Sequence, residues 1–412
     1  MHPKDIKIEE FSYPLPEEKI AKFPVINRDE AKLLVYKNGM INDFIFNEIV
    51  NFIPEKTLLI FNETKVVYAR LLMHKETGGK VEVFCLEPDD RYSDIPTAMA
   101  NKGEVHWKCL LGGGSKWKAQ QSLFLEDETL TLNAERAQQF EGGWIIRLFW
   151  NDDSLSFAEV LERLGNVPLP PYLKRETIET DKQDYQSIFA KEEGSVAAPT
   201  ASLHFTEKLV QSLKQKGVNF SPVTLHVGAG TFKPVSSDTM EGHLMHSEWI
   251  ELTIEQLRTV AHQLEQKENI IAVGTTSCRT LESLYWIGLQ LHNGISIENG
   301  NIAVHQWLPY EHKYTFIEPH EAIEAIINDL KQKNENKLIV KTQIIIAPGY
   351  SFKIINGLIT NFHQPQSTLL LLVAAMLGED WHKIYDHALK NDYRFLSYGD
   401  GSLLWLNNNE PL

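Results

Sequence analysis

The sequence predicts an α/β body that is interrupted by a small all-β module. After residue 156, helix-capping residues and short apolar runs alternate, which favours helices packed on a mainly parallel sheet. Between residues 66 and 150, short apolar runs instead lie between groups of glycines, as in modules of many short strands. With 412 residues, the chain can form a substantial core in each unit. We therefore assign residues 1–65 and 151–412 to the body and residues 66–150 to the insert.

Local signals place the elements of the first half of the chain. Residues 57–61 (Thr-Leu-Leu-Ile-Phe) form a short apolar strand candidate that ends at Asn62. In the insert, residues 81–84 and 144–148 are strand candidates. The turns of the insert fall at three glycine groups: residues 78–79, 112–114 and 142–143.

Capping residues and glycines bound the elements of the second half. Ser156 begins a helix with capping-box chemistry, and Gly165 ends it. Residues 168–172 (Pro-Leu-Pro-Pro-Tyr) predict a rigid extended segment. The remaining elements are a helix from Thr206 to Gly217, a strand over 223–227, a helix from Thr253 to Lys267, a strand over 270–273, and a buried helix over 369–377 capped by Ser367 or Thr368.

The composition is that of a soluble globular protein, with 43% hydrophobic and 23% charged residues. The first residues lack the apolar core of a signal peptide, and the longest apolar run, 369–377, is far shorter than the ~20 residues of a membrane span. The three cysteines (Cys85, Cys109 and Cys278) are too few and too widely spaced for a disulfide framework. We therefore expect a cytoplasmic protein that does not associate with membranes.

The net charge of −15 argues against indiscriminate nucleic-acid binding, because the phosphate backbone attracts positive charge. A nucleic-acid substrate held by a local basic patch remains compatible with this charge. Candidates for such a patch are Lys174, Arg175, Lys208, Lys214, Lys216 and Lys233. Taken singly, each of them is better explained as a solvated surface residue.

Five stretches place histidine, threonine or serine beside glycine or proline. Glycine permits close backbone approach, histidine moves protons near neutral pH, and threonine adds hydroxyl groups. Together they predict one composite site gathered from distant segments: residues 198–205, 224–232, 243–248, 274–279 and 360–368.

Two of these stretches directly follow strand candidates. Residues 274–277 (Gly-Thr-Thr-Ser) lie between a strand and a helix, where free N–H groups attract a carboxylate or phosphate. The alternative is that Thr276 or Ser277 simply caps the helix. Residues 228–231 (Gly-Ala-Gly-Thr) resemble a nucleotide-cradling turn but lack the spacing of a known fingerprint, so a tight turn or bulge is the alternative.

The histidine pairs admit a metal-binding and an acid–base interpretation. His243 and His246 with Glu248 contain metal-ligand residue types, but the order His-Glu-x-x-His and a third ligand at fixed spacing are lacking. We therefore favour hydrogen-bonding or acid–base roles and expect no metal. For His363, the alternative to a binding role is a structural hydrogen bond.

A further set of short segments runs nearly from end to end of the chain: residues 61–66, 69–71, 78–82, 168–172, 197–201, 224–235, 393–395 and 397–400. In residue identity and order, these segments resemble those of the S-adenosylmethionine:tRNA ribosyltransferase-isomerase family of queuosine synthesis. So many matches in the same order argue against chance.

The resemblance implies an enzyme that uses S-adenosylmethionine as a ribosyl donor, with no further cofactor. The implied acceptor is tRNA carrying 7-aminomethyl-7-deazaguanine at the wobble position. The ribose is rearranged to give epoxyqueuosine-tRNA, and adenine and methionine leave. The implied fold is a barrel-like α/β body with an inserted β-barrel domain, and we expect a monomer.

The resemblance also supplies positions for this chemistry. We expect His204 and His226 to transfer protons or contact the sugar, with the carboxylates Glu248 and Asp400 as further catalytic candidates. The donor pocket is expected to include Thr200, Gly228, Gly230 and Thr231. Residues expected to hold the methionine carboxylate or a tRNA phosphate are Thr275, Thr276 and Arg279. Further binding candidates are Arg70, His243, His246, Asn361, His363, Ser367, Thr368, Arg394 and Tyr398.

Several positions depart from the family pattern. Residues 63–65 (Glu-Thr-Lys) stand where the family has Asp-Thr-Arg, so Lys65 replaces an arginine, and Ser202 replaces a glycine. Gln366 stands where the family has a lysine, and residues 289–341 form a longer stretch than expected. These departures keep two alternatives open: ribosyl transfer from S-adenosylmethionine to a different acceptor, and a non-catalytic RNA-binding relative.

Overall fold

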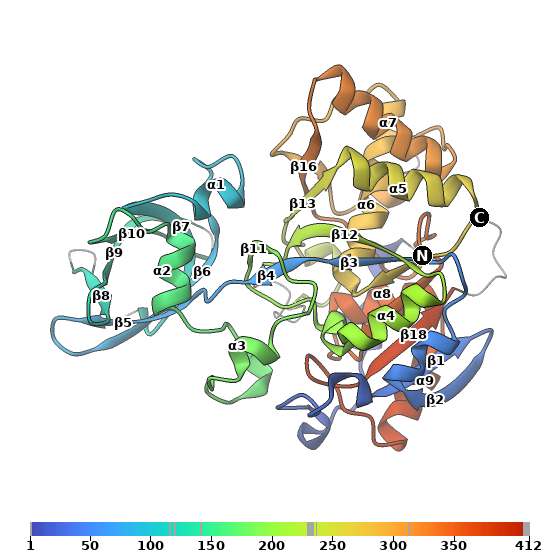
Figure 1. Cartoon of the computed structure of the whole chain (residues 1–412), viewed down its shortest axis with the longest axis horizontal. Helices are drawn as coiled ribbons and strands as arrows, with labels where there is room; N and C mark the ends of the chain where they lie inside the picture. The colour runs from blue at the N-terminus through green and yellow to red at the C-terminus, as the bar shows by residue number, and fades with distance from the viewer. Residues whose placement is uncertain are drawn as a thin grey trace.

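The computed structural model describes residues 2–114, 117–118, 121–140, 142–228, 235, 237–311 and 314–406. Figure 1 shows a large body of sheet and helices and, beside it, a smaller unit built from the segment between β5 and β10. Helix α2 lies against the smaller unit (Figure 1). The predicted fold class, an α/β body with an inserted β-barrel, is confirmed.

A sheet of ten strands forms the frame of the body. Its order is β15-β16-β13-β12-β3-β14-β17-β18-β1-β2. In chain order, these strands are β1 (Lys32–Lys37), β2 (Met40–Ile45), β3 (Leu58–Asn62), β12 (Asn219–His226), β13 (Glu248–Thr253), β14 (Ile270–Val273), β15 (Ile302–Val304), β16 (Lys337–Thr342), β17 (Gly357–Asn361) and β18 (Gly401–Trp405).

The sheet is parallel at its centre and mixed toward its edges. Strands β12, β3, β14 and β17 pair in parallel, whereas β13, β16, β18 and β2 each have an antiparallel neighbour. The β1–β2 connection is the two-residue turn of Asn38 and Gly39, both at positive φ, which only an antiparallel hairpin permits. The sheet is therefore more mixed than the helix–strand alternation of the sequence predicts.

Helices cover both faces of this sheet. Alternate residues of one strand enter different cores: Leu58 and Ile60 pack with α5, α6 and α7, whereas Leu59 packs with α4. The helices of the chain are α1 (Ile95–Met99), α2 (Phe157–Leu164), α3 (Asp181–Asp184), α4 (Glu207–Gln215), α5 (Ile254–Glu265), α6 (Thr275–His292), α7 (Pro319–Gln332), α8 (Thr368–Leu377) and α9 (Asp380–Lys390).

Four predicted helix caps are confirmed. The side chains of Ser156, Thr206, Thr253 and Ser367 each accept a hydrogen bond from a backbone N–H in the first turn of α2, α4, α5 and α8. Two local expectations are wrong. Gly274, not Thr276 or Ser277, is the N-cap residue of α6. The extended segment over 168–172 is interrupted by a 3-10 turn, Pro171–Leu173.

Six strands close the small barrel in the order β10-β7-β6-β5-β8-β9. Their bounds are β5 (Arg70–Lys75), β6 (Lys80–Pro88), β7 (Glu104–Gly112), β8 (Leu123–Glu126), β9 (Thr131–Phe140) and β10 (Gly143–Trp150). A core separate from those of the body fills the barrel, and Trp107 packs in it against Phe157 of α2. Closure leaves no open edge along which another chain could add a strand.

A two-stranded ribbon connects the barrel to the body. Strand β4 (Thr64–Val66) pairs in parallel with β11 (Glu192–Ser195). Lys65 makes ion pairs with Glu193 at 3.0 Å and with Glu162 of α2 at 3.5 Å. Val196, next to the ribbon, and Trp249 of the body pack into the barrel core. The two units are therefore packed together at the ribbon.

Candidate active site

The carboxyl ends of the central parallel strands meet at one edge of the body sheet, here called the carboxyl edge. Because β12, β3, β14 and β17 are parallel, their last residues lie along this edge. These residues are His226, Asn62, Val273 and Asn361. Strand β13 runs antiparallel to β12, and β18 runs antiparallel to β17, so their first residues, Glu248 and Gly401, reach the same edge. Ligands of open α/β sheets bind outside this edge.

His204 lies at the carboxyl edge in a buried hydrogen-bonded group. Thr200 donates to the side-chain oxygen of Asn361 at 3.0 Å, and Asn361 Nδ2 lies 3.2 Å from Nε2 of His204. The amide nitrogen can only donate, so Nε2 accepts and the ring proton belongs on Nδ1. Burial lowers the pKa of His204 to about 4, against the opposing attraction of Asp400. The imidazole is therefore neutral at pH 7.

Asp400 accepts hydrogen bonds from two chain segments near His204. Its carboxylate accepts from the backbone N–H of Lys32 at 3.1 Å and of Arg394 at 2.7 Å, and from the Arg394 guanidinium at 3.3 Å. A cavity of about 20 Å³ beside this group is lined by His204, Arg394 and Tyr398, among others. Such a volume holds little more than one water. The structure thus brings His204, Asp400 and Arg394 together.

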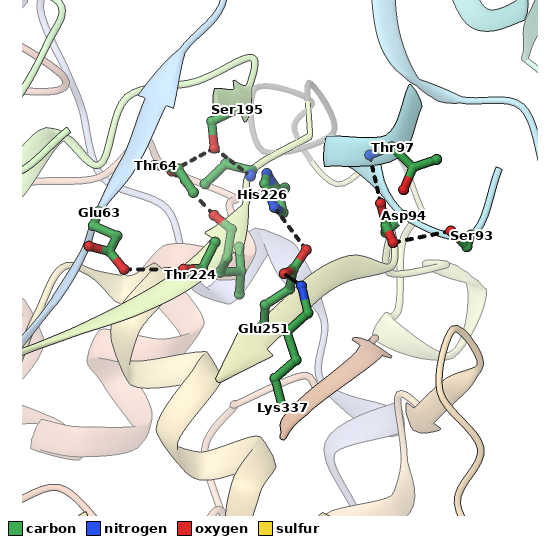
Figure 2. Close-up of polar contacts among 12 residues, drawn as sticks. Glu63, Thr64, Ser93, Asp94, Thr97, Ser195, Thr224, His226, Glu251 and Lys337 are labelled. Atoms are coloured by element: carbon green, nitrogen blue, oxygen red, sulfur yellow. Dashed lines mark hydrogen bonds and ion pairs between the residues drawn. The ribbon is translucent and has the colours of Figure 1, made fainter. Parts of the chain in front are cut away.

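His226 lies at the other end of the edge, beside Glu251 of β13 (Figure 2). Its Nε2 is 3.5 Å from Oε1 of Glu251, and Lys337 of β16 contacts the other oxygen of Glu251 at 3.0 Å. His226 is 4% exposed, and neither ring nitrogen has a hydrogen-bond partner among the described residues. Burial raises the pKa of Glu251, but the contacts with His226 and Lys337 outweigh it and lower that pKa overall.

A hydroxyl network lies next to His226 and ties β3, β11 and β12 together (Figure 2). Ser195 donates to the hydroxyl of Thr64 at 2.7 Å and accepts from the backbone N–H of Val227 at 3.0 Å. Asn62 donates to the Leu225 carbonyl at 2.8 Å. These contacts fix the backbone on which His226 stands.

Glu63 is a buried carboxylate that follows β3 directly. Its Oε1 accepts from the hydroxyl of Thr224 at 3.4 Å (Figure 2). Burial raises the pKa of Glu63, and the attraction of Lys191 opposes this shift only in part. A carboxyl group with a raised pKa at this edge is suited to exchange a proton.

Glu248 and Arg279 are paired with each other. Arg279 Nη1 lies 2.5 Å from Oε2 of Glu248, and both side chains are buried. Burial raises the pKa of Glu248, and the attraction of Arg279 opposes that shift. Nε of Arg279 donates to the Ile344 carbonyl at 3.3 Å. The remaining nitrogen, Nη2, has no hydrogen bond to a described residue. One donor of this guanidinium therefore remains for an anion.

The N-terminus of α6 lies beside the 3-10 helix that carries His204, Thr200–His204. A Cβ on Gly274 would lie 3.9 Å from Cβ of Ala201. The N-cap residue, Gly274, has no side chain that could cap α6, and Ser277 donates instead to the Val273 carbonyl at 2.9 Å. The first N–H groups of α6, near Thr275 and Thr276, therefore keep their capacity to bind an anion.

Each of the other predicted binding residues has contacts of its own with other parts of the chain. In the barrel, Arg70 contacts Glu82 at 3.3 Å. Tyr398 donates to Asp181 at 3.2 Å, and Nε2 of His363 lies 2.9 Å from the Thr360 hydroxyl. Ser367 caps α8, and Thr368 is its first residue.

The glycine-rich segment and the two neighbouring histidines were also predicted to bind substrate. Gly228 directly follows the strand of His226, whereas Gly230 and Thr231 lie outside the described residues. Burial, and secondarily the charge of His246, lowers the pKa of His243. His246 has a contact of its own, so it is not an open ligand.

The candidate basic patch consists partly of paired cations. Lys174 contacts Glu17 at 3.0 Å, Arg175 contacts Asp181 at 2.6 Å, and Lys216 donates to the Val50 carbonyl at 2.6 Å. Lys208 and Lys214 are exposed, and Lys233 lies outside the described residues.

Sequence reasoning missed Glu63, Ser195, Glu251 and Lys337. One signal was available for Glu251: it is the acidic residue within an otherwise apolar run, Trp249, Ile250 and Leu252. Nothing in the sequence marks Lys337 as its partner, because 86 positions separate the two residues.

In the described part of the chain, no three His, Cys, Asp or Glu side chains group as metal ligands. Within the same residues, no helix combines the length and the apolar character that crossing a membrane requires.

Comparisons with known proteins match nearly the whole chain. A family model described as "Queuosine biosynthesis protein" matches residues 8–404. The S-adenosylmethionine:tRNA ribosyltransferase-isomerase of Trichlorobacter lovleyi is 35% identical over 402 residues, which are 96% of this chain and 99% of the relative. The enzyme of the same name from Halothermothrix orenii is 37% identical, over 97% of this chain and 100% of the relative.

A crystal structure of the S-adenosylmethionine tRNA ribosyltransferase from Thermotoga maritima is also similar. It is 29% identical, covers 96% of this chain and 99% of its own, and superposes with a TM-score of 0.46.

Proposed function

Because the chain belongs to the family of queuosine biosynthesis proteins, we propose that its reaction takes place at the carboxyl edge of the body sheet. The protein is an S-adenosylmethionine:tRNA ribosyltransferase-isomerase, an enzyme that transfers and isomerises a ribosyl group. One observation supports the location most: histidines and hydroxyls from segments far apart in the chain converge where β12, β3, β14 and β17 end.

The acceptor, in this proposal, is the aminomethyl group of 7-aminomethyl-7-deazaguanine at the wobble position of tRNA. The amine forms a bond to the ribosyl carbon skeleton of the donor, and the product is epoxyqueuosine-tRNA. Adenine departs with a proton, and methionine departs with the electron pair of its carbon–sulfur bond. The reaction therefore needs a base, a proton donor for adenine and an anchor for the methionine carboxylate.

Two histidines suit the proton steps. The sulfonium acidifies the neighbouring C5′ protons, and His226 beside an ionised Glu251 is suited to remove one of them. His204 is neutral at pH 7, and Asn361 fixes its ring. It therefore suits a hydrogen-bonding role toward the sugar or the leaving adenine. Glu63 and Glu248, whose pKa values are raised by burial, are alternative proton carriers.

The N-terminus of α6 suits the methionine carboxylate. Its N-cap residue is a glycine, which provides no capping side chain, and the positive end of the helix dipole favours an anion there. Arg279, one turn farther along α6, supplies one unpaired donor among the described residues. Thr200, in the 3-10 helix of His204, and Gly228, which follows the strand of His226, complete the proposed donor pocket.

The enzyme needs neither a metal nor a further cofactor in this proposal, since the sulfonium donor itself carries the leaving group. It acts as a monomer in the cytoplasm. Three free buried cysteines, Cys85, Cys109 and Cys278, are compatible with a reducing compartment. Light scattering coupled to size exclusion measures the oligomeric state directly.

Adenine release tests the proposal. The enzyme is incubated with S-adenosylmethionine and tRNA that carries the deazaguanine base, and free adenine and modified tRNA are measured. We expect stoichiometric adenine and ribosylated tRNA, and no adenine with tRNA that carries unmodified guanine. Adenine release with a different acceptor would reject the proposed acceptor, and tRNA binding without turnover would reject the enzyme activity.

A further inference from the structure

The buried pair of His226 and Glu251 is not saturated with hydrogen bonds. Nε2 of His226 and Oε1 of Glu251 are 3.5 Å apart, and neither atom has a closer polar partner among the described residues. Nδ1 of His226 is buried and unpaired within the same residues. Unpaired buried polar atoms weaken a fold by about 1–3 kcal/mol each. Stability therefore does not explain why this histidine and this carboxylate lie here.

Lys337 keeps Glu251 ionised and in place. Its Nζ lies 3.0 Å from Oε2 of Glu251, so that Oε1 is the oxygen that faces His226 (Figure 2). The two residues stand on neighbouring antiparallel strands, where Glu251 pairs with Ile339 and Lys337 with Thr253. Burial alone would raise the pKa of Glu251, but the contacts with His226 and Lys337 together lower it. An ionised carboxylate only accepts hydrogen bonds.

An acceptor at Nε2 selects one tautomer of His226. The proton is drawn to Nε2, and Nδ1 is left with its lone pair. Nδ1 faces Gly194 of the connecting ribbon: a Cβ at that residue would lie only 2.7 Å from Nδ1 and 2.5 Å from Ile95 Cγ2. Gly194, at φ +131°, thus leaves room for the ring in this orientation.

We propose that Glu251 is a positioning residue for His226. It holds the imidazole in one orientation, with Nε2 protonated toward Oε1 and Nδ1 unprotonated toward Gly194. The inference rests on the proposed function, in which His226 takes part in the proton steps of ribosyl transfer.

The test uses the full-length enzyme with Glu251→Gln, which keeps the shape of the side chain and removes its charge. Loss of a residue that orients a catalytic group lowers activity by about 10–100-fold. We expect kcat for adenine release to fall by this factor while the affinity for S-adenosylmethionine is unchanged. Glu87→Gln is the matched control, because Glu87 also contacts a lysine on a neighbouring strand, Lys108 at 3.1 Å, but lies in the barrel. It should leave kcat unchanged.

A double-mutant cycle separates positioning from a structural role. If Glu251 acts through His226, Glu251→Gln should have no further effect on kcat in the His226→Ala enzyme. Losses that multiply in the double variant would overturn the inference, and so would a Glu251→Gln enzyme with wild-type kcat.

Nitrogen NMR of histidine-labelled enzyme gives a second readout that does not need turnover. The wild type should show His226 protonated at Nε2, and Glu251→Gln should show a mixture of tautomers. A wild type protonated at Nδ1 would overturn the inference. If the wild type releases no adenine at all, the proposed function fails, yet the tautomer measurement still decides what Glu251 does to His226.

Discussion

His204 and His226 are both buried, yet their neighbours prepare them for different roles. His204 is enclosed by Phe46 and Asn361, and burial lowers its pKa to about 4. His226 instead faces the carboxylate of Glu251 at 3.5 Å, and the contacts of Glu251 with His226 and Lys337 lower the pKa of that carboxyl. At the residue scale, the site therefore combines a histidine kept neutral by burial with one that lies beside a carboxylate.

Replacing His204 should reduce turnover rather than donor binding. A positioned side chain that hydrogen-bonds the reacting groups in the transition state contributes about 10²–10³-fold in kcat. We expect His204→Ala to lower kcat per folded molecule within that range, with S-adenosylmethionine affinity nearly unchanged by calorimetry. A variant that loses stability but keeps wild-type turnover would show that His204 is structural.

Acid should weaken the fold through the buried histidines. Burial lowers the pKa of His363 from its usual 6.5 to about 4. Between these values the unfolded chain binds a proton that the native chain does not, so the free energy of unfolding falls as pH drops from 6.5 to 4. The full shift corresponds to about 3 kcal/mol at most.

Urea titrations at several pH values test this. His363→Gln should show a shallower fall over that window than the wild type, whereas the exposed control His292→Gln should keep the wild-type slope. Parallel curves for the wild type and His363→Gln would contradict the prediction.

Gly194 should not tolerate a methyl group. An alanine there would bring its Cβ to 2.7 Å from His226 Nδ1 in a backbone conformation, φ +131°, that favours glycine. Strain of this kind and overpacking each cost about 1–3 kcal/mol. We expect Gly194→Ala to lower both the melting temperature and kcat. Gly217→Ala is the control, since Gly217 has positive φ but nothing within 4 Å of the added atom; it should lose some stability and no activity.

At the scale of elements, helix ends are the features that the sequence predicts best. The cap of α4 illustrates why: Thr206 accepts from the N–H of Leu209, a contact between residues three apart. Such contacts depend on local chemistry alone. The contacts between Glu251 and Lys337 and between Asn361 and His204 depend instead on which segments become neighbours in the fold. The neighbours of a strand cannot be read from a single sequence.

The strand-end location of the site was predictable for a similar local reason. Residues 270–273 were predicted as a strand, and β14 has these bounds, so the segment after it lies at the carboxyl edge. Which of the polar residues at that edge touch one another was not predictable. Arg279 and Glu248, for example, were predicted as separate site residues, but they form one buried ion pair.

Removing the cap of α4 should affect stability alone. Thr206→Ala leaves the first N–H groups of α4 without their side-chain acceptor, which costs about 0.5–2 kcal/mol. We expect a lower urea midpoint and unchanged kcat, because α4 packs on the face of the sheet and not at its carboxyl edge. Ser212→Ala, within the same helix, is the control and should change little. A large loss of kcat in Thr206→Ala would contradict this separation.

At the scale of the whole molecule, the barrel and the body meet beside His226. Ile95 of α1, in the insert, packs against Gly194, and Gly194 packs against the His226 ring. Lys65 links β11 and α2 through its two ion pairs. The barrel therefore takes part in the environment of the site, although every candidate catalytic residue stands in the body.

Donor binding should stabilise the whole chain without a metal. A ligand that binds only the native state adds about 2.7 kcal/mol at a concentration 100 times its Kd. We expect S-adenosylmethionine to raise the melting temperature and EDTA to change neither this shift nor kcat. Activity that is lost in EDTA and restored by zinc would contradict the metal-free proposal. His243 and His246 would then be the candidate metal ligands.

Transfer of label from the donor to tRNA tests the central claim most directly. The enzyme is given S-adenosylmethionine labelled in its ribose carbons and tRNA that carries 7-aminomethyl-7-deazaguanine, in a single turnover. The account predicts that the label enters the tRNA with the wild type and that the rate falls ~10²–10⁴-fold with His226→Ala, while donor binding is retained. Label transfer by His226→Ala at the wild-type rate, per folded molecule, would contradict the placement of the chemistry at this histidine.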